Sequence, residues 1–188
     1  MHPRATEPRR GAAPRPESIT TPPAVTAATA RPNGLAAGFG FDDVSPPRVV
    51  DRGRDLFAIA GSLLLYGRWL DQHRPDPALT THAYLAGSSF QRAVAADLAR
   101  SRRARVRVVE VDDRPFEFRK LSDLPNVFSL QLIEHLARRE RVNLRGRVLE
   151  RAGRATESYV VVIKRFGPGF PWRLMDVERN GRLIEVQL

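Results

Sequence analysis

The feature that most constrains the fold of this chain is a change in hydrophobic period near residue 105. Before this point apolar residues recur at helical spacing, and after it they alternate with polar residues. A helical pattern does not serve as a strand, because the two periods place side chains on different faces. Helices followed by a run of strands are typical of α+β proteins. We therefore predict an α+β fold with N-terminal helices packed on an antiparallel sheet.

Three helices are predicted in the first part. Residues 48–75 have helical spacing, and apolar residues on both sides from Leu56 onward predict a helix buried against the sheet. The sequence Pro75-Asp76-Pro77 ends it, with Asp76 placed to cap a second helix over 77–86. A third amphipathic helix starts near Phe90 and ends in arginines, which suit a helix C-terminus.

The second part is read as strands. They are expected over 105–111, 116–118, 142–151, 157–166, 172–179 and 183–188. Asn180-Gly181 is a strong hairpin signal between the last two. Residues 128–139 fit either a strand, with Phe128 and Glu134 on one face, or a helix. We favour the strand.

Residues 1–47 have a different composition. They hold nine of the 15 prolines, are rich in Ala, Thr and Arg, and show no periodicity. Such a segment cannot bury enough apolar surface to offset its ordering entropy. We expect a disordered Pro/Ala/Arg-rich tail or linker over 1–47, followed by a single α+β domain over 48–188.

The charge points to an anionic partner or to a genome rich in arginine codons. The chain carries 31 basic and 21 acidic residues, and all but two of the basic residues are arginine. Residues 1–47 contribute five arginines and four acids, so most of the net charge of +10 belongs to the predicted domain. Arginine binds phosphate and carboxylate groups through a planar fork of donors.

A row of arginines on one sheet face is the predicted binding surface. Alternation along 142–151 places Arg145, Arg147 and Arg151 together, and Arg138 and Arg139 come just before them. Such a face could contact an acidic protein or the phosphates of a nucleic acid. It could also be a solvated surface with no partner.

Several pieces of the chain resemble the nuclear transport factor 2-like superfamily. They are Tyr66-Gly67-Arg68-Trp69-Leu70, the sequence from Pro75 to Ser88, and the pair 159–166 and 171–177. The likeness covers about residues 50–179. It implies a curved, cone-like sheet wrapped around the first helix, with a cavity at its open end and frequent dimerisation through the sheet. Members include isomerases and dehydratases as well as non-catalytic assembly components, so the fold alone does not choose between them.

Candidate site residues are of two kinds. A carboxylate on an apolar face can have a raised pKa and act as a general base. Glu134 and Asp176 are such candidates, Asp176 because alternation places it with Trp172 and Leu174; each could instead pair with an arginine. Large aromatic residues could line a ligand pocket or form the core. These are Tyr66, Trp69, Phe128 and Trp172.

Other chemistries find no support. The chain has no cysteine, its four histidines lack metal-ligand spacing, and no glycine-rich phosphate loop or nucleophile elbow occurs. The longest uncharged apolar stretch of the predicted domain, 56–67, is too short to span a bilayer. We therefore expect no metal, no cofactor and no membrane span. Prolines stand where a signal peptide would be apolar, so we expect a cytoplasmic protein.

Together these features predict a non-catalytic binding or assembly module that contacts an acidic partner in a larger complex. A nucleic-acid-binding protein using the same arginines is one alternative. A small-molecule isomerase or dehydratase, or a binder, with Glu134 or Asp176 as base is another. A homodimer is compatible with all three.

Overall fold

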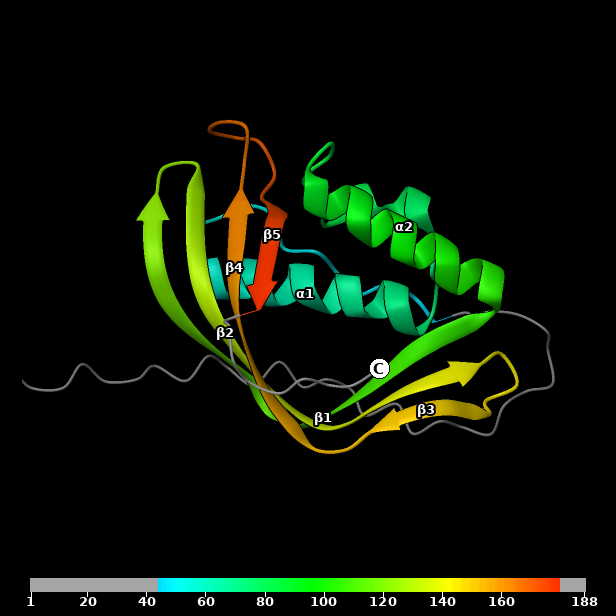
Figure 1. Ribbon diagram of the computed structural model, residues 1–188. Helices are drawn as coiled ribbons and strands as arrows, with labels where there is room; N and C mark the ends of the chain where they lie inside the picture. The colour runs from blue at the N-terminus through cyan, green and yellow to red at the C-terminus, as the bar shows by residue number, and fades with distance from the viewer. Residues whose placement is uncertain (1–43, 180–188) are drawn as a thin grey trace, which may run out of the picture.

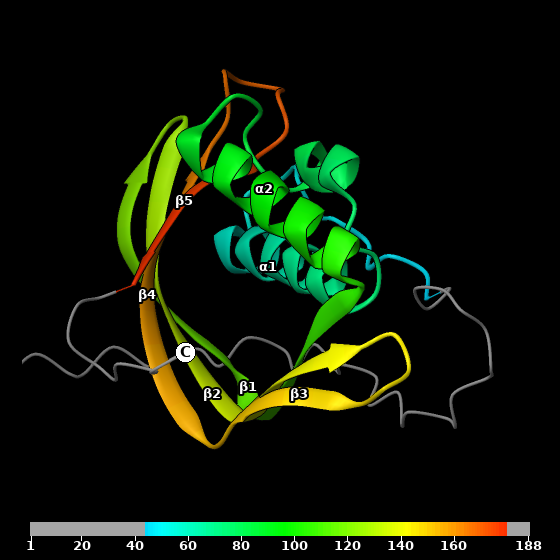
Figure 2. The same ribbon diagram turned by 45° about the vertical axis from the view of Figure 1, so that its right-hand side comes forward.

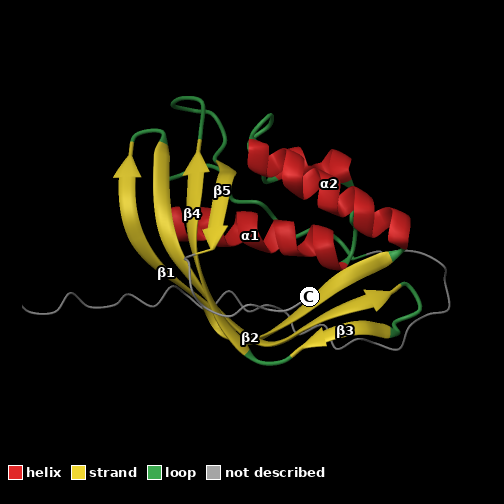
Figure 3. Ribbon diagram, in the orientation of Figure 1, coloured by secondary structure: helices red, strands yellow, loops and turns green. Residues whose placement is uncertain are grey.

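The structure is a computed structural model that describes residues 44–179. Helix α1 (Leu56–Gln72), the short 3-10 helix η1 (Pro77–His82) and helix α2 (Ser89–Ala104) precede all the strands. Strands β1 (Val106–Leu124), β2 (Val127–Asn143), β3 (Val148–Ala152), β4 (Ala155–Lys164) and β5 (Arg173–Arg179) follow. The predicted order of helices and then antiparallel strands is confirmed (Figure 3). Most of the predicted tail, the Asn180-Gly181 hairpin and the strand over 183–188 lie outside the described residues.

The strands form one antiparallel sheet in the order β1-β2-β4-β5, and β3 pairs with the far end of β2. The long strands bend, so the sheet is curved, and α1 and α2 lie on its concave side (Figures 1 and 2). Within residues 44–179, no helix combines the length and apolar character needed to cross a bilayer.

The helix boundaries correct two predictions. Residues 48–55 are not helical, because the Asp55 side chain accepts from the backbone N–H groups of Phe57 and Ala58 and starts α1 there. The second helix is a six-residue 3-10 helix rather than 77–86, although Asp76 caps it as predicted. Trp69 Nε1 of α1 also donates to the carbonyl of Val44 at 2.9 Å.

The strand boundaries correct two more predictions and confirm one. The predicted strands over 105–111 and 116–118 are one continuous strand, β1. Residues 128–139 lie in β2, as favoured. The predicted strand over 142–151 is broken by a turn, because Asn143 Oδ1 accepts from the N–H groups of Arg145 and Arg147 at 3.0 and 2.9 Å. Gly146 completes the turn with a φ of +76°.

The core lies between α1 and the near half of the sheet. Phe128, Leu130 and Leu132 point from β2 toward α1, and none is more than 1% exposed. The same cluster contains Ile59, Leu63, Leu70, Val161, Ile163 and Leu174. The far half of the sheet carries the charged groups described below.

Two glycines of α1 give a matched test of this packing. A Cβ at Gly67 would overlap the hydroxyl of the buried Tyr84 and lie 3.2 Å from its Cζ, whereas a Cβ at Gly61 meets only Phe118 at 3.9 Å. Overpacking lowers the free energy of unfolding by about 1–3 kcal/mol, whereas replacing Gly by Ala within a helix raises it by about 1 kcal/mol. In denaturant titrations, we expect Gly61→Ala to raise the free energy of unfolding and Gly67→Ala to lower it by about 1–2 kcal/mol. Equal gains in both variants would contradict the packing of Tyr84 on α1.

Candidate functional site

A charged network occupies the interior between α1 and the sheet. Arg68 of α1 contacts three carboxylates: Nε lies 2.9 Å from Glu110, Nη1 2.6 Å from Asp112 and Nη2 3.2 Å from Glu134. Its guanidinium also lies 4.7 Å over the ring of Phe116. The alternation of β1 places Glu110 and Asp112 on one face, so that a single arginine of α1 reaches both.

A bulge in β2 brings Arg139 into this network. Asp112 pairs with Leu136 but Val111 pairs with Arg138, so Ala137 is an extra residue in β2. The bulge reverses the faces that follow, and Arg139 contacts Glu110 at 2.6 Å and Glu157 at 3.3 Å. Tyr159 and Arg179 also donate to Glu157, which is only 2% exposed. The network therefore links α1 to β1, β2, β4 and β5.

The network alters the acidity of its members. Burial is the main reason that the pKa of Glu134 rises to about 7, with Arg68 opposing the rise and Glu110 adding to it. Burial, followed by the hydrogen bond to Glu157, raises the pKa of Tyr159 above its ordinary value. Glu134 can thus exchange a proton near neutral pH, but it is also the ion-pair partner of Arg68. Both roles considered from the sequence meet in this one residue.

Asp176 does not share the apolar face on which it was predicted. Leu174 pairs with the buried Ile163, whereas Asp176 pairs with Val162 on the opposite face. Met175 is the extra residue of a bulge between these two pairs. Asp176 Oδ1 accepts from the N–H of Val177 at 2.9 Å. The prediction that Asp176 points inward with Trp172 and Leu174 is therefore wrong.

The four candidate pocket aromatics belong to the hydrophobic core. Tyr66 and Trp69 lie next to each other on α1, with ring centroids 5.5 Å apart. Phe128 and Trp172 form an edge-to-face pair at 4.9 Å. All four are buried in the same cluster. Their contacts are those of packing side chains.

The five candidate arginines do not share one face, which corrects the predicted row. Arg139 lies in the interior network. Arg138 and Arg151 lie with Glu140 on the other face of the sheet, where Arg151 Nε is 2.8 Å from the Glu140 carboxylate. Arg145 and Arg147 lie in the turn between β2 and β3. The bulge at Ala137 and the turn after Asn143 explain the separation, because each interrupts the alternation.

Arg145 and Arg147 instead meet a second group of arginines. The C-terminus of α2 lies beside the β2–β3 turn, where the N–H of Leu144 donates to the carbonyl of Arg105 at 3.2 Å (Figures 1 and 2). This juxtaposition forms what we call the basic end, made by the exposed side chains of Arg103, Arg105, Arg145 and Arg147. Within the described chain, no carboxylate pairs with the guanidinium of Arg103, Arg105 or Arg147. This cluster could not be predicted from the sequence, because its two halves lie about 40 residues apart in the chain.

Arg105 adds a conformational feature to the basic end. It follows α2 in the left-handed region, with φ at +54°, and is the only described residue other than glycine with a positive φ. Glycine is the usual residue at this position of a helix end. A large cation is therefore held here at a cost in backbone energy.

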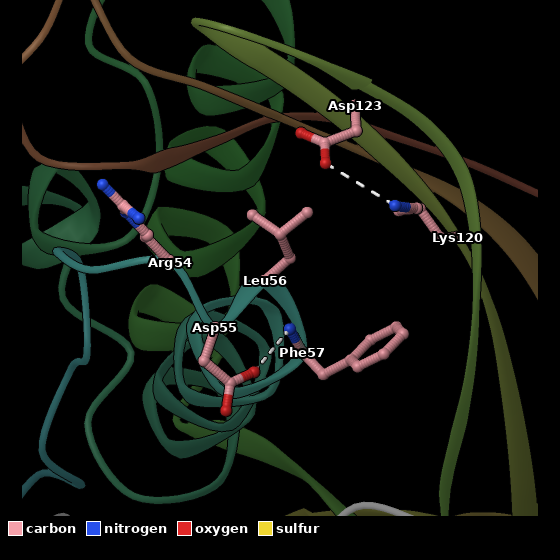
Figure 4. Close-up of a pocket in the computed structure, with 6 residues that line it drawn as sticks. All are labelled: Arg54, Asp55, Leu56, Phe57, Lys120 and Asp123. Atoms are coloured by element: carbon pink, nitrogen blue, oxygen red, sulfur yellow. Dashed lines mark hydrogen bonds and ion pairs between the residues drawn. The ribbon is translucent and has the colours of Figure 1, made fainter. Parts of the chain in front are cut away.

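A pocket of about 300 Å³ lies at the N-terminal end of α1, beside the β1–β2 hairpin (Figure 4). Its lining residues are Arg54, Asp55, Leu56, Phe57, Lys120 and Asp123. Its two carboxylates already have partners: Asp55 caps α1, and Asp123 lies 3.6 Å from Lys120. Neither of the acids predicted as a general base lines this pocket.

The described residues contain no group of three or more histidines or carboxylates placed to hold a metal ion. No protein-family model matches the chain, and no curated protein matches it either.

Proposed function

We propose that this chain is a non-catalytic binding or assembly module that contacts an acidic protein partner through the basic end. The observation that carries the proposal is the meeting of four exposed arginines from α2 and from the β2–β3 turn, three of them without a carboxylate within the described chain. Cations that are already paired gain little from a new acid, whereas Arg103, Arg105 and Arg147 can form new pairs.

The sequence resemblance fits this role. In the nuclear transport factor 2-like superfamily a cone-like sheet surrounds the first helix, and some members are non-catalytic components of assemblies. The aromatic residues that would line a cone cavity form the core here, and charged side chains fill the space beside α1. This arrangement favours a scaffold whose outer surface does the binding.

The proposal is tested with the full chain and a fluorescent polyglutamate peptide as the acidic probe. The variant Arg103→Gln/Arg145→Gln/Arg147→Gln is expected to bind about tenfold more weakly, since each exposed pair contributes a fraction of 1 kcal/mol. The matched control is Arg92→Gln/Arg114→Gln/Arg154→Gln, which removes the same charge from other exposed positions. Fluorescence anisotropy measures both affinities.

Equal losses in the two variants would mean that only net charge matters and would overturn the proposal. A single-stranded oligonucleotide of equal charge serves as a second probe. If it binds far more tightly than the peptide, with a steep fall in salt, the nucleic-acid alternative replaces the proposal. Arg105→Gly is an internal control, because it is expected to weaken peptide binding while removing the strain of a positive φ and leaving the protein at least as stable.

One observation favours a second candidate function, a small-molecule enzyme or binder. Burial raises the pKa of Glu134 to about 7, and this residue lies close to the half-buried Tyr159, whose hydroxyl donates to Glu157; such an arrangement suits proton transfer. Native mass spectrometry of the full chain, purified without nuclease, tests it. A retained small molecule that Glu134→Gln releases would support this function over the first.

A further inference from the structure

The most exposed large apolar side chains gather at one end of the sheet. Leu121 and Leu124 of the β1–β2 hairpin are 53% and 61% exposed, and Phe166 and Phe170 of the β4–β5 loop are 68% and 56% exposed. No other large apolar side chain within residues 44–179 exceeds 48%. We call these four side chains the tip surface. It lies at the end of the sheet away from the basic end (Figure 1).

The two loops of the tip surface are held together. The N–H of Arg165 donates to the carbonyl of Asn126 at 3.0 Å, and Arg165 Nη2 donates to the carbonyl of Pro125 at 2.7 Å. The same guanidinium lies 4.4 Å over the ring of the buried Trp172. The backbone N–H of Phe170 donates to the carbonyl of Gly167 at 3.1 Å and closes a turn. Phe166 and Phe170 are thus displayed by an ordered loop.

Cations border the tip surface. Arg119 and Lys120 come directly before Leu121 and are exposed, and Arg54 lies across the adjoining pocket from Lys120 (Figure 4). Two carboxylates lie near these cations: Asp123 pairs with Lys120, and Asp55 caps α1. Positive charge therefore remains beside the exposed phenylalanines and leucines.

We propose that the tip surface inserts into the surface of a lipid bilayer that contains anionic phospholipids. Apolar side chains beside cations are the composition that binds at a membrane interface, with the cations at the headgroups. The side chains come from the end of β1 and from the β4–β5 loop, and a fluid bilayer accommodates such a surface without a complementary groove. The proposal is independent of the basic end, because the two sites lie at opposite ends of the sheet.

The test is cosedimentation of the full chain with vesicles of phosphatidylcholine alone or with 30% phosphatidylglycerol, at about 0.1 M salt. We expect binding only to the anionic vesicles. Phe166→Ser/Phe170→Ser is expected to reduce the partition coefficient at least tenfold. The matched control, Val148→Ser/Leu149→Ser, removes exposed apolar residues of β3 and is expected to change it less than twofold.

Three results would overturn the proposal. They are no binding to anionic vesicles, unchanged binding by the phenylalanine variant, and a loss caused only by Arg145→Gln/Arg147→Gln, which would assign vesicle binding to the basic end. Sedimentation velocity addresses a second copy of the chain as the occupant. A dimer that the phenylalanine variant dissociates would assign the tip surface to self-association instead. Tryptophan fluorescence gives a direct readout. Brominated lipid is expected to quench the fluorescence of the tryptophan introduced by Phe166→Trp and not that of the one introduced by Leu149→Trp.

Discussion

Replacing Arg68 with leucine is expected to lower the free energy of unfolding by about 3–5 kcal/mol, the range for breaking a buried ion pair from one side. The loss comes from the carboxylates left behind. Glu110, Asp112 and Glu134 all contact this guanidinium, and each is at least partly buried. Without it, Glu110 and Asp112 are left as like charges in a poorly hydrated space, and Glu134 must take up a proton beside them, with Arg139 left to oppose the charges. Urea titration at pH 7 measures the effect.

Two further variants identify the cause. Arg68→Leu combined with Glu134→Gln is expected to recover part of the loss, because the folded chain then no longer has to take up a proton at residue 134. Arg92→Leu, an exposed arginine of α2, is expected to change stability by less than about 0.5 kcal/mol. If Arg68→Leu behaved like Arg92→Leu, the three contacts of Arg68 would contribute nothing, and the charged interior would not hold α1 to the sheet.

The sequence contained most of the architecture because periodicity is a local signal. The alternation of Phe128, Leu130 and Leu132 was enough to favour a strand over a helix, and all three are buried. Asp76 capped the second helix as its position indicated. The length of that helix was wrong because a 3-10 helix and the start of an α-helix share the same opening residues.

The candidate site was harder to predict because single-residue bulges reverse the faces of a strand. An extra Ala137 turns Arg139 inward, and an extra Met175 turns Asp176 away from the core. Alternation counted along the sequence fails after each bulge. Neither Ala137 nor Met175 carries a local signal that would reveal it.

The basic end combines a signal that was present with one that was absent. Asn143 followed by Gly146 is a turn pattern, although it lies within a segment that otherwise alternates. The contact of this turn with the end of α2 depends on how the sheet pairs, which no local pattern contains. Arg68 carries a further local signal, because it is the only charged residue among the first 15 residues of α1.

The interior network carries an unbalanced charge. It joins charged groups of α1 and four strands, so the space beside α1 is taken up by ion pairs. Counted together, four carboxylates meet three guanidinium groups, those of Arg68, Arg139 and Arg179. The excess is one negative charge. A proton on one carboxylate would balance the set.

We expect Glu134, which contacts Arg68 directly, to hold this proton because burial raises its pKa, and we expect its titration to appear in the stability of the protein. Burial raises its pKa from 4.5 to about 7, so between these values the folded chain binds a proton that the unfolded chain has released. Stability therefore falls as pH rises from about 4.5 to about 7 and is level above that range. At about 1.4 kcal/mol per pH unit, this fall is about 3 kcal/mol.

Glu134→Gln removes the titration while keeping the size of the side chain. We expect the variant to match the native chain near pH 4.5 and to exceed its free energy of unfolding by about 3 kcal/mol at pH 8, with most of the difference appearing by pH 7. Glu150→Gln is the control, since this exposed carboxylate pairs with Arg141 outside the network. Urea titrations at half-unit steps of pH compare the three proteins. Parallel curves for Glu134→Gln and the native chain would place the excess proton on another member of the network, because only a group that has lost its titration can flatten the profile.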